Sequence, residues 1–239
     1  MNFLCVVPVY NEEEKLQQLC DEIVDFKKNN SNIEFLIINN GSFDGSEKII
    51  KNSKLLYKTN EINMGVGYAL IQGFYFAQNN KYDVLVHLAG NGKMKPKEIK
   101  KFMDKIIYEN YDFVNGSRFI QEGNFNNNPK IRIILIKILT FLISFLYSKK
   151  ITDATCGFRA FKLYTLSNLI RHVDNQKYYT YRYEYFTLGK ILLNKEVRFT
   201  EIGVTMDYKK KNYSKIRPIL DWLPIIFGWL EALFDKRKI

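Results

Sequence analysis

Short apolar segments alternate with segments of helical periodicity along the first half of the chain, and this alternation constrains the fold more than any other feature. The run from Phe3 to Val9 is continuously apolar and rich in β-branched residues, which is typical of a parallel strand covered on both faces. Apolar residues from Leu16 to Phe26 then recur at helical spacing behind an acidic first turn. A second apolar run at 33–38 and a second helical segment at 47–52 repeat the order. We therefore predict an α/β fold with a mostly parallel central sheet flanked by helices.

The alternation continues and then ends. We predict a helix at 64–79, a strand at 83–88, a helix at 97–108 and a strand from residue 113, followed by helices at 131–147 and 219–234. In open parallel sheets, ligands bind beyond the carboxyl ends of the strands. We therefore expect a nucleotide site where residues 10–12, 39–46 and 89–94 meet.

Composition limits the partners. The chain has 239 residues and a net charge of +11, which favours one domain and an anionic partner such as a nucleotide diphosphate, a lipid phosphate, a membrane surface or a nucleic acid. From Phe125 to Arg171 there are eight basic residues and one acid, Asp153, so the basic excess is regional. We expect a domain at 1–218 and a C-terminal amphipathic helix at 219–239 that associates with a membrane.

Cysteine usage and hydropathy indicate a compartment. Cys5, Cys20 and Cys156 are widely spaced and suit neither a disulfide framework nor a zinc site. No signal peptide and no membrane-spanning segment is expected, because no apolar stretch reaches the roughly 20 residues that a spanning helix needs. We predict a cytoplasmic protein that is peripherally associated with the membrane.

Eight short motifs follow one another in a recognisable order. They are VVPVYNE (6–12), NNGSFDGS (39–46), NMGVGYALIQGF (63–74), KPKEI (95–99), NGSRF (115–119), TDATCGFRAFK (152–162), Glu184 and NYSK (212–215). This series resembles the dolichyl-phosphate mannosyltransferase-like branch of the family 2 glycosyltransferases, the polyprenyl-phosphate sugar transferases. The resemblance implies a GT-A fold, a nucleotide-sugar donor and a polyprenyl phosphate or related glycan acceptor reached at the membrane face.

The chain departs from the family pattern at its metal site. Asn39-Asn40 replaces a pair of aspartates, and Ala89-Gly90-Asn91, followed by Lys93, replaces the DxD motif and its glutamine. Divalent cations such as Mg²⁺ prefer carboxylate and phosphate oxygens, which these side chains do not supply. We therefore predict no ordinary divalent-metal site and no cofactor.

Positive side chains are the expected replacement for the metal. Transfer from a nucleoside diphosphate sugar leaves negative charge on the departing diphosphate, which a metal or fixed cations must neutralise. Lys93 lies where the family has a metal ligand, so its ammonium could contact the diphosphate with help from Lys209 and Lys215. Alternatively, Lys93 is a solvated turn residue, as most loop lysines are.

The resemblance also implies which residues bind the donor. Asparagine and acid side chains at strand ends can hydrogen-bond the base and ribose of the donor, although the same residue types are common turn formers. The predicted donor-binding set is Pro8, Tyr10, Asn11, Glu12, Asn40, Asp44, Asn63, Gly65, Ala89, Gly90, Asn91, Lys209 and Lys215.

A second set is assigned to catalysis and to the acceptor. Arg118 and Arg132 resemble the family arginines that hold the acceptor phosphate, and a guanidinium suits phosphate bidentately. The predicted catalytic residues are Lys93, Arg118, Asp153 and Arg159, and the predicted acceptor-binding residues are Arg118, Arg132, Glu184 and Ser214. The alternative is that Asp153 and Arg159 form a structural turn and an ion pair near the site, that Arg132 marks a membrane-facing helix end, and that Glu184 is structural.

No general base stands out, which fits a phosphate acceptor because a phosphate is already ionised and chiefly needs positioning. His87 is more typical of a packed core residue than of a catalyst.

The two apolar helices near residues 131–147 and 219–234 suggest an interfacial role, since aromatic residues beside lysines and arginines suit lipid headgroups. They could instead cover the sheet or form a homo-oligomer. A non-catalytic nucleotide-sugar-binding relative remains an alternative function. Nucleic-acid binding is not expected, because no recognisable basic platform is present.

Overall fold

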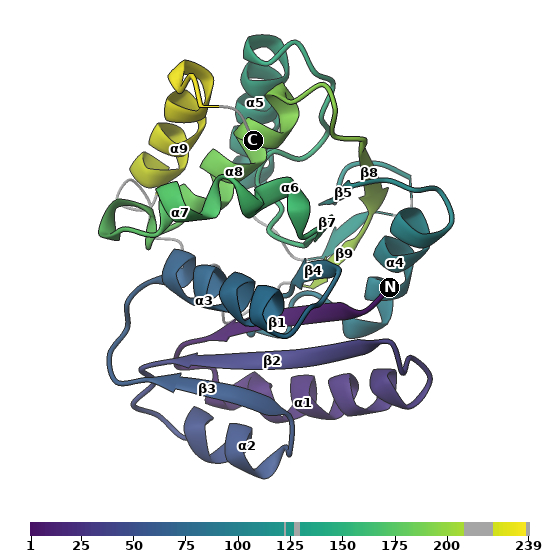
Figure 1. Ribbon diagram of the computed structural model, residues 1–239, viewed down its shortest axis with the longest axis vertical. Coiled ribbons are helices and arrows are strands. Elements are labelled where there is room, and N and C mark those ends of the chain that lie inside the picture. The colour runs from purple at the N-terminus through teal and green to yellow at the C-terminus, as the bar shows by residue number, and fades with distance from the viewer. Residues whose placement is uncertain (122, 127–129, 208–221, 238–239) are drawn as a thin grey trace.

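The computed structural model describes residues 1–121, 123–126, 130–207 and 222–237 (Figure 1). Its strands are β1 (Phe3–Val9), β2 (Ile33–Asn40), β3 (Leu56–Asn60), β4 (Val84–His87), β5 (Phe113–Ser117), β6 (Asn124–Asn126), β7 (Arg159–Lys162), β8 (Phe199–Gly203) and β9 (Thr205–Asp207). Its α-helices are α1 (Glu13–Lys28), α2 (Ser46–Asn52), α3 (Val66–Asn79), α4 (Ile99–Ile107), α5 (Lys130–Leu146), α6 (Tyr164–Ser167), α7 (Ile170–Val173), α8 (Arg182–Leu193) and α9 (Trp222–Phe234), with 3₁₀ turns η1 (Pro96–Glu98) and η2 (Gln176–Tyr178).

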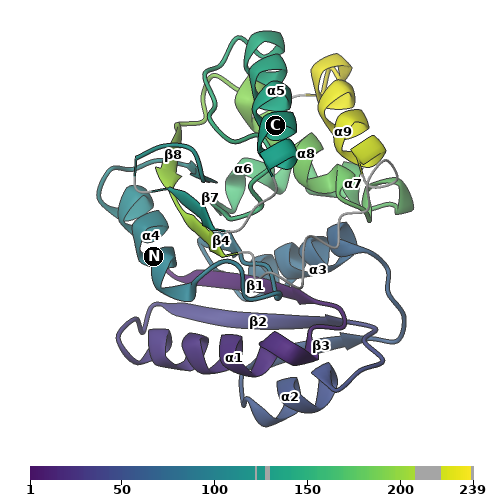
Figure 2. The same cartoon turned by 180° about the vertical axis from the view of Figure 1, so that it is seen from behind.

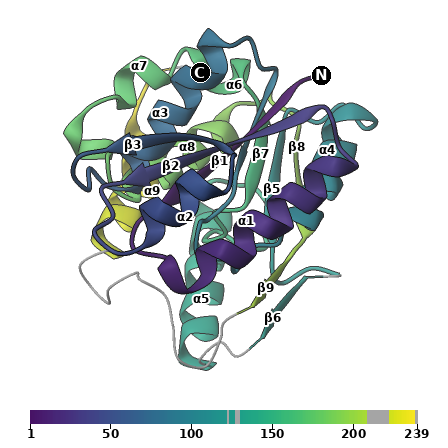
Figure 3. The same cartoon turned by 90° about the horizontal axis from the view of Figure 1, so that it is seen from below.

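A mostly parallel sheet forms the centre of the molecule. Seven strands lie in the order β3-β2-β1-β4-β7-β5-β8, and β7 alone among them runs antiparallel to its neighbours. Strands β1, β2 and β4 are parallel, so their carboxyl ends lie next to one another. A separate pair, β6 and β9, lies at the side of the domain (Figure 3). The predicted α/β architecture is confirmed.

Helices cover both faces of the sheet. One apolar cluster joins one sheet face to α1, α2 and α4 through residues such as Leu16, Ile50 and Phe102. The other joins the opposite face to α3, α5, α8 and α9 through residues such as Phe74 and Trp229. Figures 1 and 2 show α1 and α3 on opposite sides of β1 and β2. Continuous burial of β1 on both faces explains why its sequence is apolar throughout.

Helix α9 packs closely on α8. Trp229 is 1 % exposed and lies against Tyr147 and Tyr185. Glu231 accepts hydrogen bonds from Tyr178 and Arg182 and pairs with Lys177. The residues of α9 therefore belong to the core of the main domain. The division of the chain into a domain at 1–218 and a C-terminal segment at 219–239 stays a prediction.

Candidate active site

Three loops meet at the carboxyl edge of the sheet, as predicted. Residues 10–12 follow β1, residues 41–45 follow β2 and residues 88–95 follow β4. The neighbouring order β2-β1-β4 brings these loops together from positions about 80 residues apart in the chain.

The loop after β2 caps helix α1. The Asn11 amide donates to Ser42 Oγ (3.0 Å), the Glu12 amide to Ser46 Oγ (2.9 Å) and the Glu13 amide to an Asp44 carboxylate oxygen (3.1 Å). The bonds from Glu12 and Glu13 satisfy amide groups that every helix N-terminus leaves without an intrahelical acceptor, and the bond from Asn11 fixes the residue before the N-cap. Partial burial would raise the pKa of Asp44, but its hydrogen bonds with Ser46 and the Glu13 amide outweigh this and lower it. Asp44 and Asn11 thus have structural partners at the predicted donor site.

Asn40 holds together the loop that enters α3. Its side-chain amide donates to Asn63 Oδ1 (2.9 Å) and to the Gly65 carbonyl (3.1 Å). Its oxygen accepts from Asn60 Nδ2 (2.9 Å) and from the Met64 amide (3.3 Å). An aspartate cannot donate, so this bonding pattern requires the amide. All four hydrogen-bonding positions of Asn40 are used within the protein, which argues against a direct contact with the donor base.

Two predicted glycines are needed for close backbone contact. Gly65 has φ +93°, and a Cβ there would lie 2.1 Å from the Tyr179 carbonyl oxygen. Gly90 donates its amide to the Pro8 carbonyl (3.2 Å), and a Cβ there would lie 2.5 Å from that oxygen. Neither position tolerates a side chain, so both glycines shape the edge of the sheet.

Lys93 is buried in the turn that follows β4. Its side chain is 8 % exposed, and its amide donates to Asn91 Oδ1 (3.2 Å). Together with Asn91, Lys15, Lys95 and Asp207, it lines a pocket between α1 and this turn. The interpretation of Lys93 as a solvated turn residue is therefore wrong, and its burial beside Asn91 fits a dedicated role.

The turn after β4 does not offer the ligands that a divalent metal prefers. Ala89 donates its amide to Met94 Sδ (3.3 Å), and Ala89, Gly90 and Asn91 present no carboxylate. Within the described ranges, no three His, Cys, Asp or Glu side chains lie close enough together to hold a metal ion.

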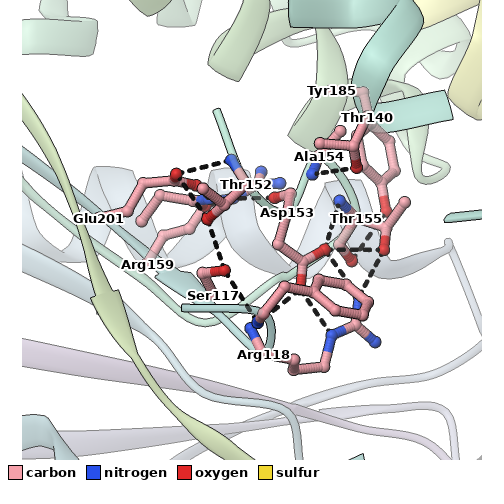
Figure 4. A network of polar contacts seen from close by, with 12 residues as sticks. Ser117, Arg118, Thr140, Thr152, Asp153, Ala154, Thr155, Arg159, Tyr185 and Glu201 are labelled. Carbon is pink, nitrogen blue, oxygen red and sulfur yellow. Dashed lines mark hydrogen bonds and ion pairs between the residues drawn. The ribbon is translucent and has the colours of Figure 1, made fainter. Parts of the chain in front are cut away.

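Arg118 and Asp153 form a buried ion pair beside these loops (Figure 4). Arg118 Nε lies 2.6 Å from Asp153 Oδ2 and Nη2 lies 2.8 Å from Oδ1, with side-chain exposures of 2 % and 0 %. Nη2 also donates to Thr155 Oγ1 (2.5 Å). The structural alternative, an ion pair between Asp153 and Arg159, is wrong in its partner, because Asp153 pairs with Arg118. A carboxylate that is fully buried with both oxygens bonded orients Arg118, and a catalytic role of Asp153 stays a prediction.

Arg159 contacts different partners. Its Nε donates to Asn115 Oδ1 (3.2 Å), its Nη1 donates to the Glu184 carbonyl (2.8 Å), and its guanidinium lies 5.5 Å from the Tyr185 ring centroid. Burial raises the pKa of the Glu184 carboxyl, and the nearby Arg159 only partly offsets this. The side chain of Glu184 faces Gly157, where a Cβ would lie 3.0 Å from Oε1. A buried acid with a raised pKa beside a guanidinium is typical of a functional site.

Sequence reasoning missed Glu201, which supports the turn that carries Asp153. One Glu201 oxygen accepts from the Thr152 amide and hydroxyl (both 2.7 Å), and the other accepts from Asn115 Nδ2 (3.0 Å) (Figure 4). Burial raises the pKa of Glu201 despite these hydrogen bonds. Nothing in the short strand β8, whose sequence is FTEIG, marks this acid as buried, so the sequence offered no signal for it.

His87 is a core residue, as predicted. It is 5 % exposed and lies edge-on against Phe161, with ring centroids 5.1 Å apart. Burial, with a smaller contribution from Arg159, lowers its pKa to about 3, so the ring is neutral at physiological pH.

Arg132 of α5 and Tyr10 of the loop after β1 complete the predicted residues that the structure describes. Arg132 is half-buried in the first turns of α5, and Tyr10 lies edge-on to Phe43, with ring centroids 6.1 Å apart. The predicted residues Lys209, Ser214 and Lys215 lie outside the described residues.

An apolar surface on α5 lies close to the turn at residues 152–155, which also contacts Arg118. Thr140 Oγ1 of α5 accepts the Ala154 amide (3.1 Å), which ties the helix to the residue after Asp153. On its outer face, Phe141 and Phe145 are 70 % and 75 % exposed. Further exposed apolar residues of α5 and α9 are Ile131, Ile134, Leu135, Ile138, Leu142, Leu146, Leu223, Ile226, Phe227, Leu230 and Phe234. None of the helices in the described part of the chain combines the length and apolar character needed to cross a bilayer.

Comparison with known proteins identifies the family. Residues 4–170 match the model of "Glycosyl transferase family 2". The chain is 24% identical over 221 residues to a polyprenol monophosphomannose synthase of Mycolicibacterium smegmatis, covering 89% of this chain and 80% of that protein. It is 24% identical over 221 residues to an undecaprenyl-phosphate mannosyltransferase of Micrococcus luteus, covering 90% and 88% of the two chains.

The fold is shared with a solved glycosyltransferase. A crystal structure of glucosyl-3-phosphoglycerate synthase from Mycobacterium tuberculosis, in complex with Mn²⁺, UDP-glucose and phosphoglyceric acid, superimposes with a TM-score of 0.70. The identity is 16%, and the match covers 97% of this chain and 79% of that one. Since the family model spans more than half of the chain and the α/β fold agrees, the chain belongs to glycosyl transferase family 2.

Proposed function

We propose that this glycosyltransferase moves a sugar from a nucleoside diphosphate donor to a polyprenyl phosphate at a membrane surface, without a carboxylate-bound metal. The observation that carries the proposal is that one turn, residues 152–155, joins Arg118 to the apolar helix α5 through Asp153 and Ala154. A guanidinium suited to phosphate thus lies beside a surface suited to lipid. Relatives named for polyprenol and undecaprenyl phosphate support this acceptor class.

The reaction needs few protein groups. An oxygen of the acceptor phosphate attacks the anomeric carbon of the sugar, and the bond to the nucleoside diphosphate breaks with both electrons going to the departing diphosphate. The acceptor is already an anion, so positioning matters more than a general base. In this proposal Lys93, Lys209 and Lys215 offset the charge of the diphosphate, Arg118 and Arg132 position the acceptor phosphate, and Glu184 with Arg159 contacts sugar hydroxyl groups.

Metal independence is the part of the proposal that differs from the compared synthase, whose structure contains Mn²⁺. It is supported by the side chains of the turn after β4, where Ala89, Gly90 and Asn91 supply no carboxylate and Lys93 supplies a cation.

A transfer assay tests the proposal. Radiolabelled nucleotide sugars are incubated with a short-chain prenyl phosphate in detergent, with and without EDTA. Labelled prenyl phosphate sugar formed equally in both conditions is expected. Transfer that stops in EDTA and returns with Mn²⁺ would refute metal independence, and the absence of transfer from every donor would refute the transferase.

The loss of the metal-binding carboxylates favours one second candidate, a relative that binds nucleotide sugars without turnover. Such a protein would be stabilised by a nucleotide sugar in a thermal shift experiment and would form no product.

A further inference from the structure

A lysine of α5 contacts the side chain of Phe119, the residue after Arg118. The ammonium of Lys137 lies 5.7 Å from the centroid of the Phe119 ring, and the guanidinium of Arg118 lies 5.6 Å from the same centroid. Cations within about 6 Å of a ring centroid are attracted by the ring. Phe119 therefore contacts a cation from the end of β5 and a cation from α5, and the acceptor phosphate is expected beside the first of them, Arg118.

The charges of these two cations are balanced differently. The carboxylate of Asp153 contacts Arg118 at 2.6 and 2.8 Å and offsets its charge. Lys137 is exposed, and the ion pairs among the described residues provide no carboxylate for it. In the stretch from residue 125 to 171, Asp153 is the only acid in the sequence. Lys137 therefore contributes positive charge that an incoming anion can use.

Helix geometry places Lys137 at the edge of the apolar surface. With about 100° per residue, it lies between the face that packs inward through Thr140 and Ile143 and the exposed face that carries Phe141 and Phe145. If the exposed face rests among acyl chains, this edge lies at the depth of the headgroups. A polyprenyl phosphate carries its phosphate at the same depth.

We propose that Lys137 is an acceptor-binding residue whose ammonium contacts the phosphate of the polyprenyl phosphate while Phe119 holds the side chain in place. This assignment rests on the proposed function. A phosphate monoester carries a charge of about −1.5 to −2 at pH 7, and the guanidinium of Arg118 is already shared with Asp153. Lys137 supplies the additional charge.

Steady-state kinetics with a short-chain, detergent-soluble prenyl phosphate test the assignment. Lys137→Ala should raise the acceptor KM about tenfold, the lower end of what a charge-assisted hydrogen bond contributes, and leave the donor KM unchanged. Lys137→Arg should restore most of the affinity. Lys150→Ala is the matched control, because it removes an exposed lysine beyond the other end of α5 and should leave both KM values unchanged.

The competing explanation is that Lys137 only anchors the protein to anionic lipid. An unchanged acceptor KM in Lys137→Ala, together with weaker binding to phosphatidylglycerol vesicles, would overturn the assignment and leave the proposed function standing. An inactive wild-type protein would refute the proposed function and the role of Lys137 with it. Equal thermal unfolding midpoints of the variants, expected for exposed side chains, exclude misfolding as the cause of a raised KM.

Discussion

Replacing Asn40 with aspartate should destabilise the protein, although the family resemblance leads one to expect an aspartate at this position. The side-chain amide of Asn40 donates to Asn63 Oδ1 and to the Gly65 carbonyl. In Asn40→Asp both acceptors lose this donor, although Asn63 Oδ1 keeps the Gly65 amide and the Gly65 carbonyl keeps the Ala69 amide. An ionised carboxylate then faces two oxygens.

The size of the effect follows from these contacts. Asn40 is 3 % exposed, so water cannot easily replace the lost donors. Leaving a buried polar group without its partner costs about 1–3 kcal/mol. Both acceptor oxygens keep one other donor, so we expect a decrease of about 1–3 kcal/mol in the free energy of unfolding, which is still a sizeable part of the stability of a typical domain.

Urea unfolding at pH 7 measures this difference. Asn110→Asp is the matched control, because Asn110 is exposed and its Oδ1 only accepts a bond, from Lys162 Nζ (2.6 Å), which a carboxylate retains. The control should unfold at or above the wild-type midpoint. Equal midpoints for Asn40→Asp and wild type would refute the claim that the amide holds this loop.

The pH dependence provides a second check on Asn40→Asp. Neighbouring acceptor oxygens and burial disfavour the ionised form, so the pKa of the introduced carboxyl is raised in the folded protein. The penalty is then complete above this raised pKa and shrinks as the pH falls toward the ordinary aspartate value of about 3.9, because the protonated carboxyl can donate again. A penalty that is constant between pH 7 and pH 4 would contradict this reasoning.

Three further outcomes are expected. Lys93→Ala should lower kcat/KM for the donor about tenfold, because it removes a charge that offsets the departing diphosphate. Ala89→Asp combined with Asn91→Asp should not create metal-dependent transfer of comparable size. Near-wild-type donor kinetics for Lys93→Ala would remove Lys93 from the site. Glu184→Gln should stabilise the protein at pH 7, because burial raises the pKa of this carboxyl, and the gain should vanish as the pH falls below the usual glutamate range. Urea unfolding at pH 7 and below that range measures the stability. The same variant should reduce transfer, which the transfer assay measures. Phe141→Ser should weaken sedimentation with anionic vesicles and leave detergent-based transfer unchanged, and equal vesicle binding would argue against α5 as the membrane surface.

The sequence predicted the arrangement of the loops because strong periodic signals specify it. Apolar runs such as Phe3–Val9 and the helical spacing after it indicate parallel strands joined by helices. Neighbouring parallel strands place their carboxyl ends at one edge, so the positions of residues 10–12, 39–46 and 89–94 follow directly. The short strand β7 carried no comparable signal, and its antiparallel insertion was not predicted.

That unpredicted strand explains the wrong ion pair. Strand β7 places Arg159 opposite His87 and next to α8, where the Glu184 carbonyl and Asn115 accept its hydrogen bonds. Asp153 precedes the strand and turns toward the end of β5, where Arg118 lies. Sequence proximity favoured Arg159, but the partner was set by which strands are neighbours.

The charges already paired at the carboxyl edge decide how a diphosphate could be held there. Lys95 contacts Glu22 at 3.1 Å, and Arg118 is bound by Asp153, so neither brings its full charge to a ligand. In the proposed metal-free mechanism, several cations, Lys93 among them, would therefore share the charge of the diphosphate. Because the charge is shared, removing Lys93 should weaken donor binding rather than abolish transfer. If removing Lys93 abolished activity completely, Lys93 alone would carry the charge compensation that a bound metal ion provides in other enzymes, and the charge would not be shared.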